Sequence, residues 1–435
     1  MNFLLVVALI IFIVSFLTMI FEIYDKTIVA MAGAILMVIV GILDFEEAVA
    51  AIDFETIGLL LGMMIIVDLA TSSGIFSWMS VKMTKLTRGR PWMIFVLFLS
   101  VTFLMSAFLD NVTTVLIIVP IVLSLTQGMG LNSRLFLIAL IMFANIGGSL
   151  TLIGDPTNII IGSAAKLTFN QFISHQIIPV GAVSIVLICL VGIFHWSTLR
   201  PISGNLKKLF VTHLLIQKIE KQFVKIQLKK SFVIAVLTIL FLTISGFIFQ
   251  NHLSFPISII SLAGASMLLI LTSQHSSVHE TFSKIEWPTL FFFIGLFIMV
   301  AGLKKVGLLD MIGHGIIGFS DNYLILVLLL LWLTGFISMV LDNIPFVTIM
   351  VPIVFQVQTT LPPTVDSTLL WWALSLGACI GGCGSPLGAS CNVVSLGAAR
   401  KQGITVSFLE YIKIAFPLTI VALGVCSVYF ILLLS

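Results

Sequence analysis

Long runs of apolar residues restrict the fold of this chain more than any other feature. Runs of roughly 18 or more apolar residues recur from end to end, and each is long enough to cross a bilayer as a helix. Apolar residues make up 60% of the sequence and charged residues 9%, against about 25% charged residues in soluble domains. Because the lipid interior offers backbone groups no hydrogen bonds, we expect an all-α polytopic membrane protein.

Ten of these runs are expected to be transmembrane spans, two of them interrupted. They lie near 2–20, 28–43, 56–72, 134–165 (interrupted), 176–199, 231–249, 257–273, 288–303, 367–399 (interrupted) and 411–434. Two further apolar stretches, 92–127 and 323–359, each carry Leu-Asp-Asn in the middle. We interpret each as a re-entrant helical hairpin that enters the membrane and returns. A hairpin and a pair of full spans give the same parity, so both alternatives stay open.

A basic segment divides the chain and predicts its orientation. Segment 200–230 holds eight Lys and Arg residues and a single acid, Glu220. Cytoplasmic loops carry an excess of Lys and Arg, so this segment is expected in the cytoplasm. Counting spans outward then places eighteen of the 21 basic residues inside and both termini on the extracytoplasmic side. We expect an integral protein of a prokaryotic inner (plasma) membrane.

Several motifs occur twice at nearly constant spacing. Leu109-Asp110-Asn111 reappears as Leu341-Asp342-Asn343 at an offset of 232 residues. At an offset of 234, Gly147-Gly148, Gly154 and Asn158 reappear as Gly381-Gly382, Gly388 and Asn392. Five spans and one hairpin per half make an odd number of crossings, so the second copy is expected upside down. We predict a first inverted repeat over 1–199, a cytoplasmic basic linker over 200–230 and a second inverted repeat over 231–435, a pattern of secondary transporters.

The interruptions of the two broken spans are candidate binding sites. Glycine and proline in 145–158 and 381–392 unwind the helix, and unwound backbone at membrane depth is tolerated only where it is buried or lines a cavity. Its free carbonyls can hold a cation, and the start of the resuming helix can hold an anion. The candidate substrate- and ion-binding residues, at the interruptions and at the hairpin tips, are Asp110, Asn111, Asn145, Gly148, Thr151, Asp155, Asn158, Asp342, Asn343, Gly382, Cys383, Ser385 and Asn392.

The coupling ion is expected to be Na⁺ or a proton, and no cofactor is expected. Hard oxygen ligands for Na⁺ are offered by Asp110, Asn111, Asn158, Asp342, Asn343 and Asn392. A proton could instead ride on a carboxylate, because desolvation favours the neutral acid. The simpler alternatives are that the tip aspartates only cap the returning helices and that glycine and proline only kink a packed helix.

An aspartate and three cysteines in the apolar segments each allow two interpretations. Asp68 lies inside the third span, and the equivalent position in the second half is Ala301. Because the carboxylate is not repeated, we expect a structural role or a position near the cytoplasmic end. Cys379, Cys383 and Cys391 surround the second interruption. Their thiols could hold a thiophilic species such as trivalent arsenic, or pack as small buried apolar groups.

Four stretches carry a family resemblance: LDNVTTVLIIVP, NIGGSLTLIGDPTN, LDNIPFVTIMVP and LGACIGGCGSPLGASCNVV. They resemble the P protein group of the ion transporter superfamily, which also contains the arsenite efflux pump ArsB, the NhaD sodium/proton antiporters and citrate carriers. The resemblance implies a scaffold domain and a mobile transport domain that moves as an elevator, often in a homodimer. By similarity to the dicarboxylate transporters of the superfamily, it places Na⁺ and a substrate carboxylate at Asp110, Asn111, Gly148, Asn158, Asp342, Asn343, Gly382 and Asn392.

The sequence departs from its relatives at the second interruption. Cys383 and Ser385 stand where Asn and Thr are usual, and Pro386 replaces an apolar residue. Thr157 stands where proline is commoner in the first interruption. A lost asparagine beside the substrate prevents transfer of any particular specificity.

These features together predict an ion-coupled secondary transporter of a small anion or oxyanion, of arsenite or carboxylate type. A Na⁺/H⁺ antiporter is the alternative, an anion channel is a third hypothesis, and enzymatic activity is not expected. The expected partners are the lipid bilayer, a small inorganic or organic ion and a second copy of the chain; no nucleic acid partner is expected. The sequence has no Gly-x-x-x-x-Gly-Lys nucleotide loop, so an ATP-driven pump would need a separate ATPase subunit.

Overall fold

The computed structural model describes residues 3–21, 23–87, 90–195, 199, 230–273, 277–309, 311, 322–362 and 366–434. Every regular element within these ranges is helical, which confirms the all-α fold. Eight of the described helices are long and apolar enough to cross a membrane. They are α4 (Phe54–Ser72), α6 (Pro91–Phe108), α7 (Asn111–Met129), α10 (Phe169–Phe194), α13 (Lys230–Ile248), α17 (Trp287–Lys305), α19 (Tyr323–Val340) and α23 (Phe408–Leu434).

Further helices complete the described part of the chain. The apolar ones are α1 (Phe3–Ile20), α2 (Lys26–Ile39), α8 (Ser133–Gly148), α15 (Ile257–Thr272), α20 (Asn343–Thr360) and α21 (Leu369–Gly381). The remainder are α3 (Phe45–Ala50), α5 (Ile75–Leu86), α9 (Pro156–Ala165), α14 (Gln250–Leu253), α16 (Val278–Ser283), the 3-10 turn η1 (Gly382–Gly384) and α22 (Ser390–Lys401). Helix α5 was not among the expected spans.

The expected spans can be compared with the helices of the structure. Most coincide with a helix to within a few residues, but α10 begins at Phe169, earlier than the expected 176–199. Thr168 and Gln171 form a capping box that starts α10 at this point. Of the basic linker 200–230, only Lys230 lies within the described residues, where it begins α13. The cytoplasmic location of the linker and the orientation of the termini stay predictions.

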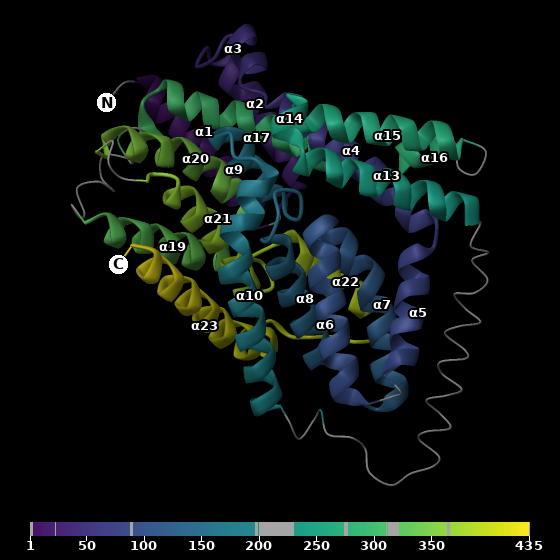
Figure 1. Ribbon diagram of the computed structural model, residues 1–435. Coiled ribbons are helices and arrows are strands. Elements are labelled where there is room, and N and C mark those ends of the chain that lie inside the picture. Colours follow the sequence, from purple (N-terminus) through teal and green to yellow (C-terminus); the bar gives the residue numbers. More distant parts are fainter. Residues whose placement is uncertain are drawn as a thin grey trace.

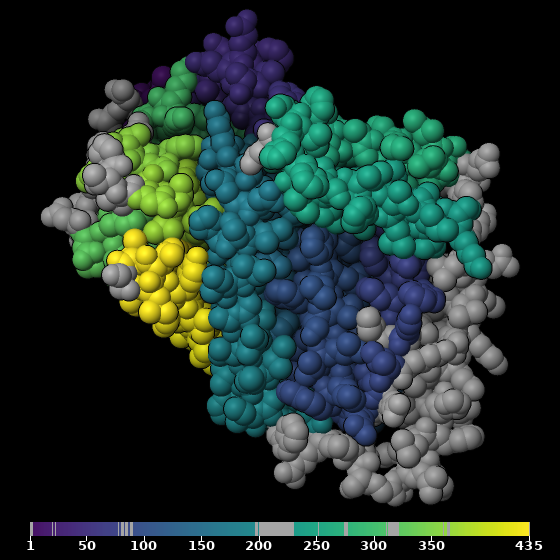
Figure 2. Space-filling view, viewed as in Figure 1, coloured from purple at the N-terminus to yellow at the C-terminus, as the bar shows by residue number. Residues whose placement is uncertain are grey.

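The helices form two groups that are visible in Figure 1. We call α1, α2, α4, α13, α15 and α17 the flanking layer, and α6 to α9 with α19 to α22 the hairpin bundle. In Figure 1, α13 and α15 lie side by side at the upper right, and α6, α7 and α8 stand below them. The long helix α10 runs down the front face beside α23 (Figure 2). The two groups meet where α4 approaches α9 and α17 approaches α20.

Two glycines allow the closest helix crossings of the flanking layer. A Cβ on Gly62 of α4 would lie 2.6 Å from the backbone carbon of Ser261 on α15. A Cβ on Gly295 of α17 would lie 2.6 Å from the backbone carbon of Ala30 on α2. The two glycines are separated by 233 residues, the spacing of the repeated motifs. Each therefore packs a helix of one half of the chain against a helix of the other.

We expect Gly295→Ala to destabilise the protein, because the new methyl group meets backbone that cannot move aside. Overpacking of this kind costs about 1–3 kcal/mol. The midpoint of thermal unfolding in detergent, followed by tryptophan fluorescence, should fall. The matched control is Gly424→Ala in α23, where a Cβ meets no heavy atom of the described residues within 4 Å, so its midpoint should stay equal or rise. Equal midpoints for the two variants would contradict the close-crossing interpretation.

Candidate functional site at the helix interruptions

Both expected interruptions are present in the structure. Helix α8 ends at Gly148 and α9 begins at Pro156, while α21 passes through η1 to Gly384 and α22 begins at Ser390. Residues 149–155 and 385–389 between them are not helical. The sequence-based prediction that each half contains a broken helix is therefore confirmed.

Each unwound segment folds back onto the end of the helix that precedes it. It also contacts the first helix of the hairpin in the same half, which is α6 in the first half and α19 in the second. A Cβ on Gly154 would lie 2.6 Å from the carbonyl oxygens of Gly148 and Ser106. At the equivalent position, a Cβ on Gly388 would lie 2.6 Å from the carbonyl oxygen of Ser338 and 2.7 Å from that of Gly382. Only glycine fits such an approach, which explains the repeated Gly-Gly and Gly spacing. Gly148 and Gly382 thus serve the packing of the break in this conformation.

Hydroxyl groups join the hairpin arms to the breaks in the same way in both halves. Thr151 Oγ1 donates to the carbonyl of Ala107, and Ser385 Oγ donates to that of Met339. The serine pair Ser106 and Ser338 donates to the carbonyls of Ala144 and Ala378 at 2.5 and 2.7 Å. Every pair is related by 232 or 234 residues. The contacts therefore repeat along with the sequence motifs, whereas the inverted orientation of the two copies stays a prediction.

Two buried asparagines satisfy the free carbonyls of the unwound backbone. The side-chain amide of Asn158 donates to the carbonyls of Thr151 at 2.9 Å and Gly148 at 3.2 Å. The amide of Asn392 donates to those of Ser385 at 2.8 Å and Gly382 at 2.7 Å. Both side chains are fully buried. The carbonyls that were expected to hold a cation therefore already accept hydrogen bonds from these amides.

Both hairpin tips and both breaks meet in one buried polar network. The amide of Asn111, at the first tip, donates to Asp155 Oδ2 at 2.7 Å and to Asn145 Oδ1 at 3.1 Å. Asn145 in turn donates to Asn392 Oδ1 at 2.8 Å. Asn343, at the second tip and 2% exposed, faces the Asp155 carboxylate. The sequence-based candidates are therefore neighbours in space, and Asp155 lies among them.

The two halves also hold each other through the asparagines of the breaks. Asn158 Oδ1 accepts a hydrogen bond from Ser375 of α21 at 2.7 Å, and Asn392 Oδ1 accepts one from Asn145 of α8. Each break asparagine is thus oriented by a residue from the opposite half. Ser375 was not among the sequence-based candidates, since a serine inside an apolar helix gives no distinct signal.

The two breaks differ in polarity. Asp155 caps α9 by accepting from the backbone N–H of Thr157 at 2.9 Å, whereas the residue that precedes α22, Ala389, has no side chain able to cap. Cys379 stands at the position equivalent to Asn145. The buried polar centre is therefore supplied mainly by the first half of the chain.

The buried cysteines behave as packed thiols. Cys383 donates to the carbonyl of Met142 at 3.7 Å, and Cys379 donates to Asn158 Oδ1 at 3.6 Å. Within the described residues, no three His, Cys, Asp or Glu side chains are placed to hold a metal ion. The geometry thus favours the packing alternative over a thiolate site for these cysteines.

Two cavities lie beside the hairpin tips, between the hairpin bundle and the flanking layer. The first, here called the Asp342 cavity, has a volume of about 400 Å³. The second, the Asp110 cavity, has a volume of about 500 Å³. Four residues line both, namely Lys26, Phe292, Ser390 and Val394. Each tip aspartate thus opens to its own cavity, and the two cavities adjoin at Lys26.

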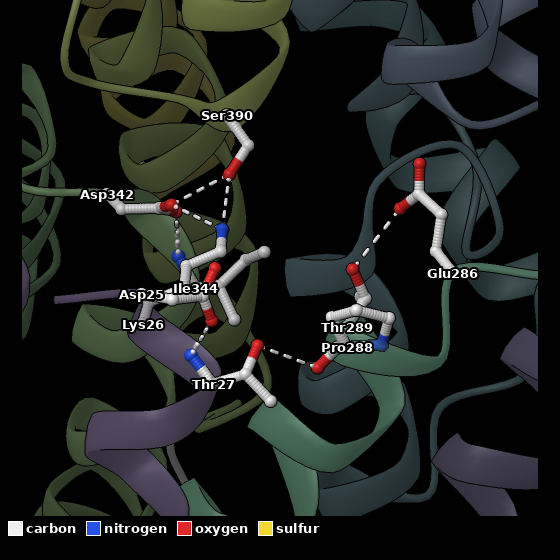
Figure 3. Close-up of polar contacts among 9 residues, drawn as sticks. All are labelled: Asp25, Lys26, Thr27, Glu286, Pro288, Thr289, Asp342, Ile344 and Ser390. Carbon is white, nitrogen blue, oxygen red and sulfur yellow. Dashed lines mark hydrogen bonds and ion pairs between the residues drawn. The ribbon is translucent and has the colours of Figure 1, made fainter.

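The tip aspartates differ in their partners. Asp110 Oδ1 accepts from the backbone N–H of Thr113 at 2.8 Å, and its Oδ2 accepts from the hydroxyl of the same residue. Asp342 Oδ2 accepts from Ser390 Oγ at 2.8 Å and pairs with Lys26 Nζ at 3.3 Å (Figure 3). Asp110 has no cationic partner among the described residues. Both aspartates cap helices, as the simpler interpretation expected, and both also line cavities.

Five charged residues that line the cavities were missed as site residues by sequence reasoning, namely Asp25, Lys26, Asp68, Lys284 and Glu286. Asp68 lines the Asp110 cavity, 3.9 Å from Lys284 Nζ, and its buried Oδ2 has no hydrogen-bond partner among the residues that the structure describes. Lys26 was counted only as a basic residue for orientation. The signal available for Asp68 was its carboxylate within an apolar span, since such residues usually serve a function.

Interrupted helices whose ends meet hairpin tips beside cavities define a secondary membrane transporter. The chain belongs to the citrate transporter family, whose sequence model matches residues 9–377. It is 35% identical over 429 residues to an uncharacterized transporter of Mycobacterium tuberculosis, covering 98% of this chain and 97% of that one. The match to the P protein of Mus musculus is 32% over 483 residues, covering 94% of this chain and 58% of that protein.

A solved structure agrees with the fold. The YdaH transporter of Alcanivorax borkumensis superposes with a TM-score of 0.55 at 15% sequence identity, covering 89% of both chains. The comparisons confirm the family resemblance and an integral membrane transporter. They leave the substrate, the coupling ion and the binding residues as proposals.

We expect Asn392→Ala to lower stability more than a neighbouring buried substitution. The change leaves the carbonyls of Gly382 and Ser385 without a donor, and each unpaired buried acceptor costs about 1–3 kcal/mol. The matched control is Ser395→Ala on the same helix, because Ser395 Oγ donates to a carbonyl four residues earlier in that helix. Thermal unfolding in detergent should show a lower midpoint for Asn392→Ala alone. Equal losses would contradict a special role of the break asparagine.

Proposed function

We propose that this chain is an ion-coupled secondary transporter of a small anion or oxyanion, of arsenite or carboxylate type. The hairpin bundle would be the mobile transport domain and would move as an elevator against the flanking layer. The observation that carries the proposal is the buried network of side chains that joins both tips and both breaks, formed by Asn111, Asn145, Asp155, Asn343 and Asn392. Polar groups at membrane depth are costly and usually mark a transport pathway.

The arrangement of the cavities supports movement between the two groups of helices. The network of hydrogen bonds ties both halves of the hairpin bundle to each other, so that they would move as one body. The cavities lie at the contact between that bundle and the flanking layer, where a bound ion would be carried along with the tips. Lys26 and Ser390, which line both cavities, offer donors to an anion.

Coupling to Na⁺ or to a proton is part of the proposal. Of the six residues expected to bind Na⁺, Asp110 and Asp342 open to cavities, whereas Asn111, Asn158, Asn343 and Asn392 are buried. The side-chain oxygens of Asn158 and Asn392 already accept hydrogen bonds. A cation would therefore bind at the tip carboxylates and not at the break asparagines, and Asp155 is a buried carboxylate of the same network.

A Na⁺/H⁺ antiporter is the second candidate, and one observation favours it. Three carboxylates, Asp68, Asp110 and Glu286, line the Asp110 cavity together with two lysines, Lys26 and Lys284. An excess of acids suits a cycle in which the cavity alternately holds Na⁺ and protons. Vesicles with reconstituted protein should separate the two candidates. Exchange of Na⁺ for protons with no anion present supports the antiporter, and saturable anion uptake with counterflow supports the anion carrier.

We expect Asp110→Asn and Asp342→Asn each to abolish transport in such vesicles, because each removes a tip carboxylate that a coupling ion needs. The thermal unfolding midpoint should stay close to that of the parent protein, since asparagine also caps helices. Glu46→Gln is the matched control, an exposed carboxylate of α3 outside the cavities, and should transport normally. Parent-like turnover in both aspartate variants would exclude the tips from the coupling site.

A further inference from the structure

Lys26 connects the two groups of helices. It begins α2 of the flanking layer, and its Nζ lies 3.3 Å from Asp342 Oδ2 and 2.9 Å from Ser390 Oγ (Figure 3). The ammonium also lies 5.2 Å from the ring centre of Phe292. Of the ion pairs between described residues, this is the one that joins the flanking layer to the hairpin bundle.

The ion pair is open to an incoming solute. The side chain of Lys26 is 38% exposed and that of Asp342 is 24% exposed. Lys26 lines both cavities and is the only basic residue lining the Asp342 cavity among the described residues. An anion that entered either cavity would therefore meet this ammonium, and in the Asp342 cavity it would meet no other cation.

The carboxylate of Asp342 shows how an anion would be held. Its Oδ2 accepts from Ser390 Oγ and from Lys26 Nζ at the same time, while its Oδ1 accepts from the backbone N–H of Ile344 at 3.2 Å. The donors on Oδ2 come from two other segments of the chain. A substrate carboxylate or oxyanion could accept from both, and Asp342 would keep its bond to Ile344.

We propose that Lys26 is the anion-recognition residue and that the incoming anion displaces Asp342 from Lys26 and Ser390. This inference rests on the proposed transport of an anion. Displacement leaves the ammonium paired with the substrate and leaves Asp342 with an uncompensated negative charge. Since an unpaired charge in a half-buried site is costly, the displaced carboxylate attracts a cation. Binding of the anion thus creates the site for the coupling Na⁺ or proton.

The unequal partners of the tips fit this role. Asp110 and Asp342 are equivalent in sequence, yet among the described residues only Asp342 forms an ion pair with a lysine. Asp110 is free to respond to a cation at all times, whereas Asp342 responds only when an anion has taken its lysine. The exchange of partners at Lys26 therefore orders the binding of the two ions.

Calorimetric titration of citrate and of inorganic phosphate into the purified protein tests the exchange. One of these anions is expected to bind the parent protein. The affinity of Lys26→Gln for that anion should be lower by about tenfold or more, since a charged partner is lost. Asp342→Asn should strengthen it several-fold, because the internal competitor of the anion is gone. Lys305→Gln is the matched control, a lysine that is paired with Glu47 and lines neither cavity, and it should change affinity less than twofold.

The opposite signs for the two variants make the test decisive. Three results would each overturn the proposal. They are parent-like affinity in Lys26→Gln, weaker binding in Asp342→Asn, and no binding of either probe to Asp342→Asn at millimolar concentration. The double variant Lys26→Gln/Asp342→Asn removes both charges and controls for folding. It should unfold at the parent temperature and bind as weakly as Lys26→Gln; parent-like binding by this variant would overturn the proposal.

Anion uptake into vesicles separates this inference from the proposed function. If the parent transports citrate or phosphate while Lys26→Gln retains its affinity, anion transport stands and the role of Lys26 fails. If the parent takes up neither anion but exchanges Na⁺ for protons, the anion carrier fails, and the partner exchange at Lys26 fails with it.

Discussion

Unwound backbone within a membrane protein must find its hydrogen bonds inside the protein, and the arrangement of the site depends on this requirement. The breaks at 149–155 and 385–389 free carbonyl groups that lipid cannot satisfy. The amides of Asn158 and Asn392 donate to those carbonyls, and hydroxyls from Thr151 and Ser385 attach the breaks to the hairpins. The break is thus a defined structure, held by side chains, and can position charged groups precisely.

The same asparagines connect the halves of the chain. Their oxygens accept from Ser375 and Asn145, which belong to the opposite halves. Satisfying the backbone of one break therefore depends on the correct packing of the other half. In the flanking layer, Gly62 and Gly295 achieve a comparable interlocking through close helix contact. Neither half has a complete site or a complete layer by itself.

Sequence reasoning located the breaks and tips because their signals are strong in an apolar background. Several glycines and a proline close together interrupt an apolar span, a carboxylate at membrane depth is rare, and the repetition of both signals at nearly one spacing points to a shared structure. The short amphipathic helix α5 was missed because it has no long apolar run. Lys26 was missed because a lysine at the start of a span is an ordinary topological signal; its pairing with Asp342 depends on contacts across 316 residues.

The difference between Asp155 and Ala389 has a consequence for charge balance. A fully symmetric duplication would have placed two carboxylates at the meeting point of the breaks, where they would repel each other with little water to screen them. Alanine in the second copy leaves one acid there, surrounded by asparagine amides. The difference between the two breaks lets the protein keep a negative group in its interior, and it leaves the centre with a single carboxylate to balance a positive charge.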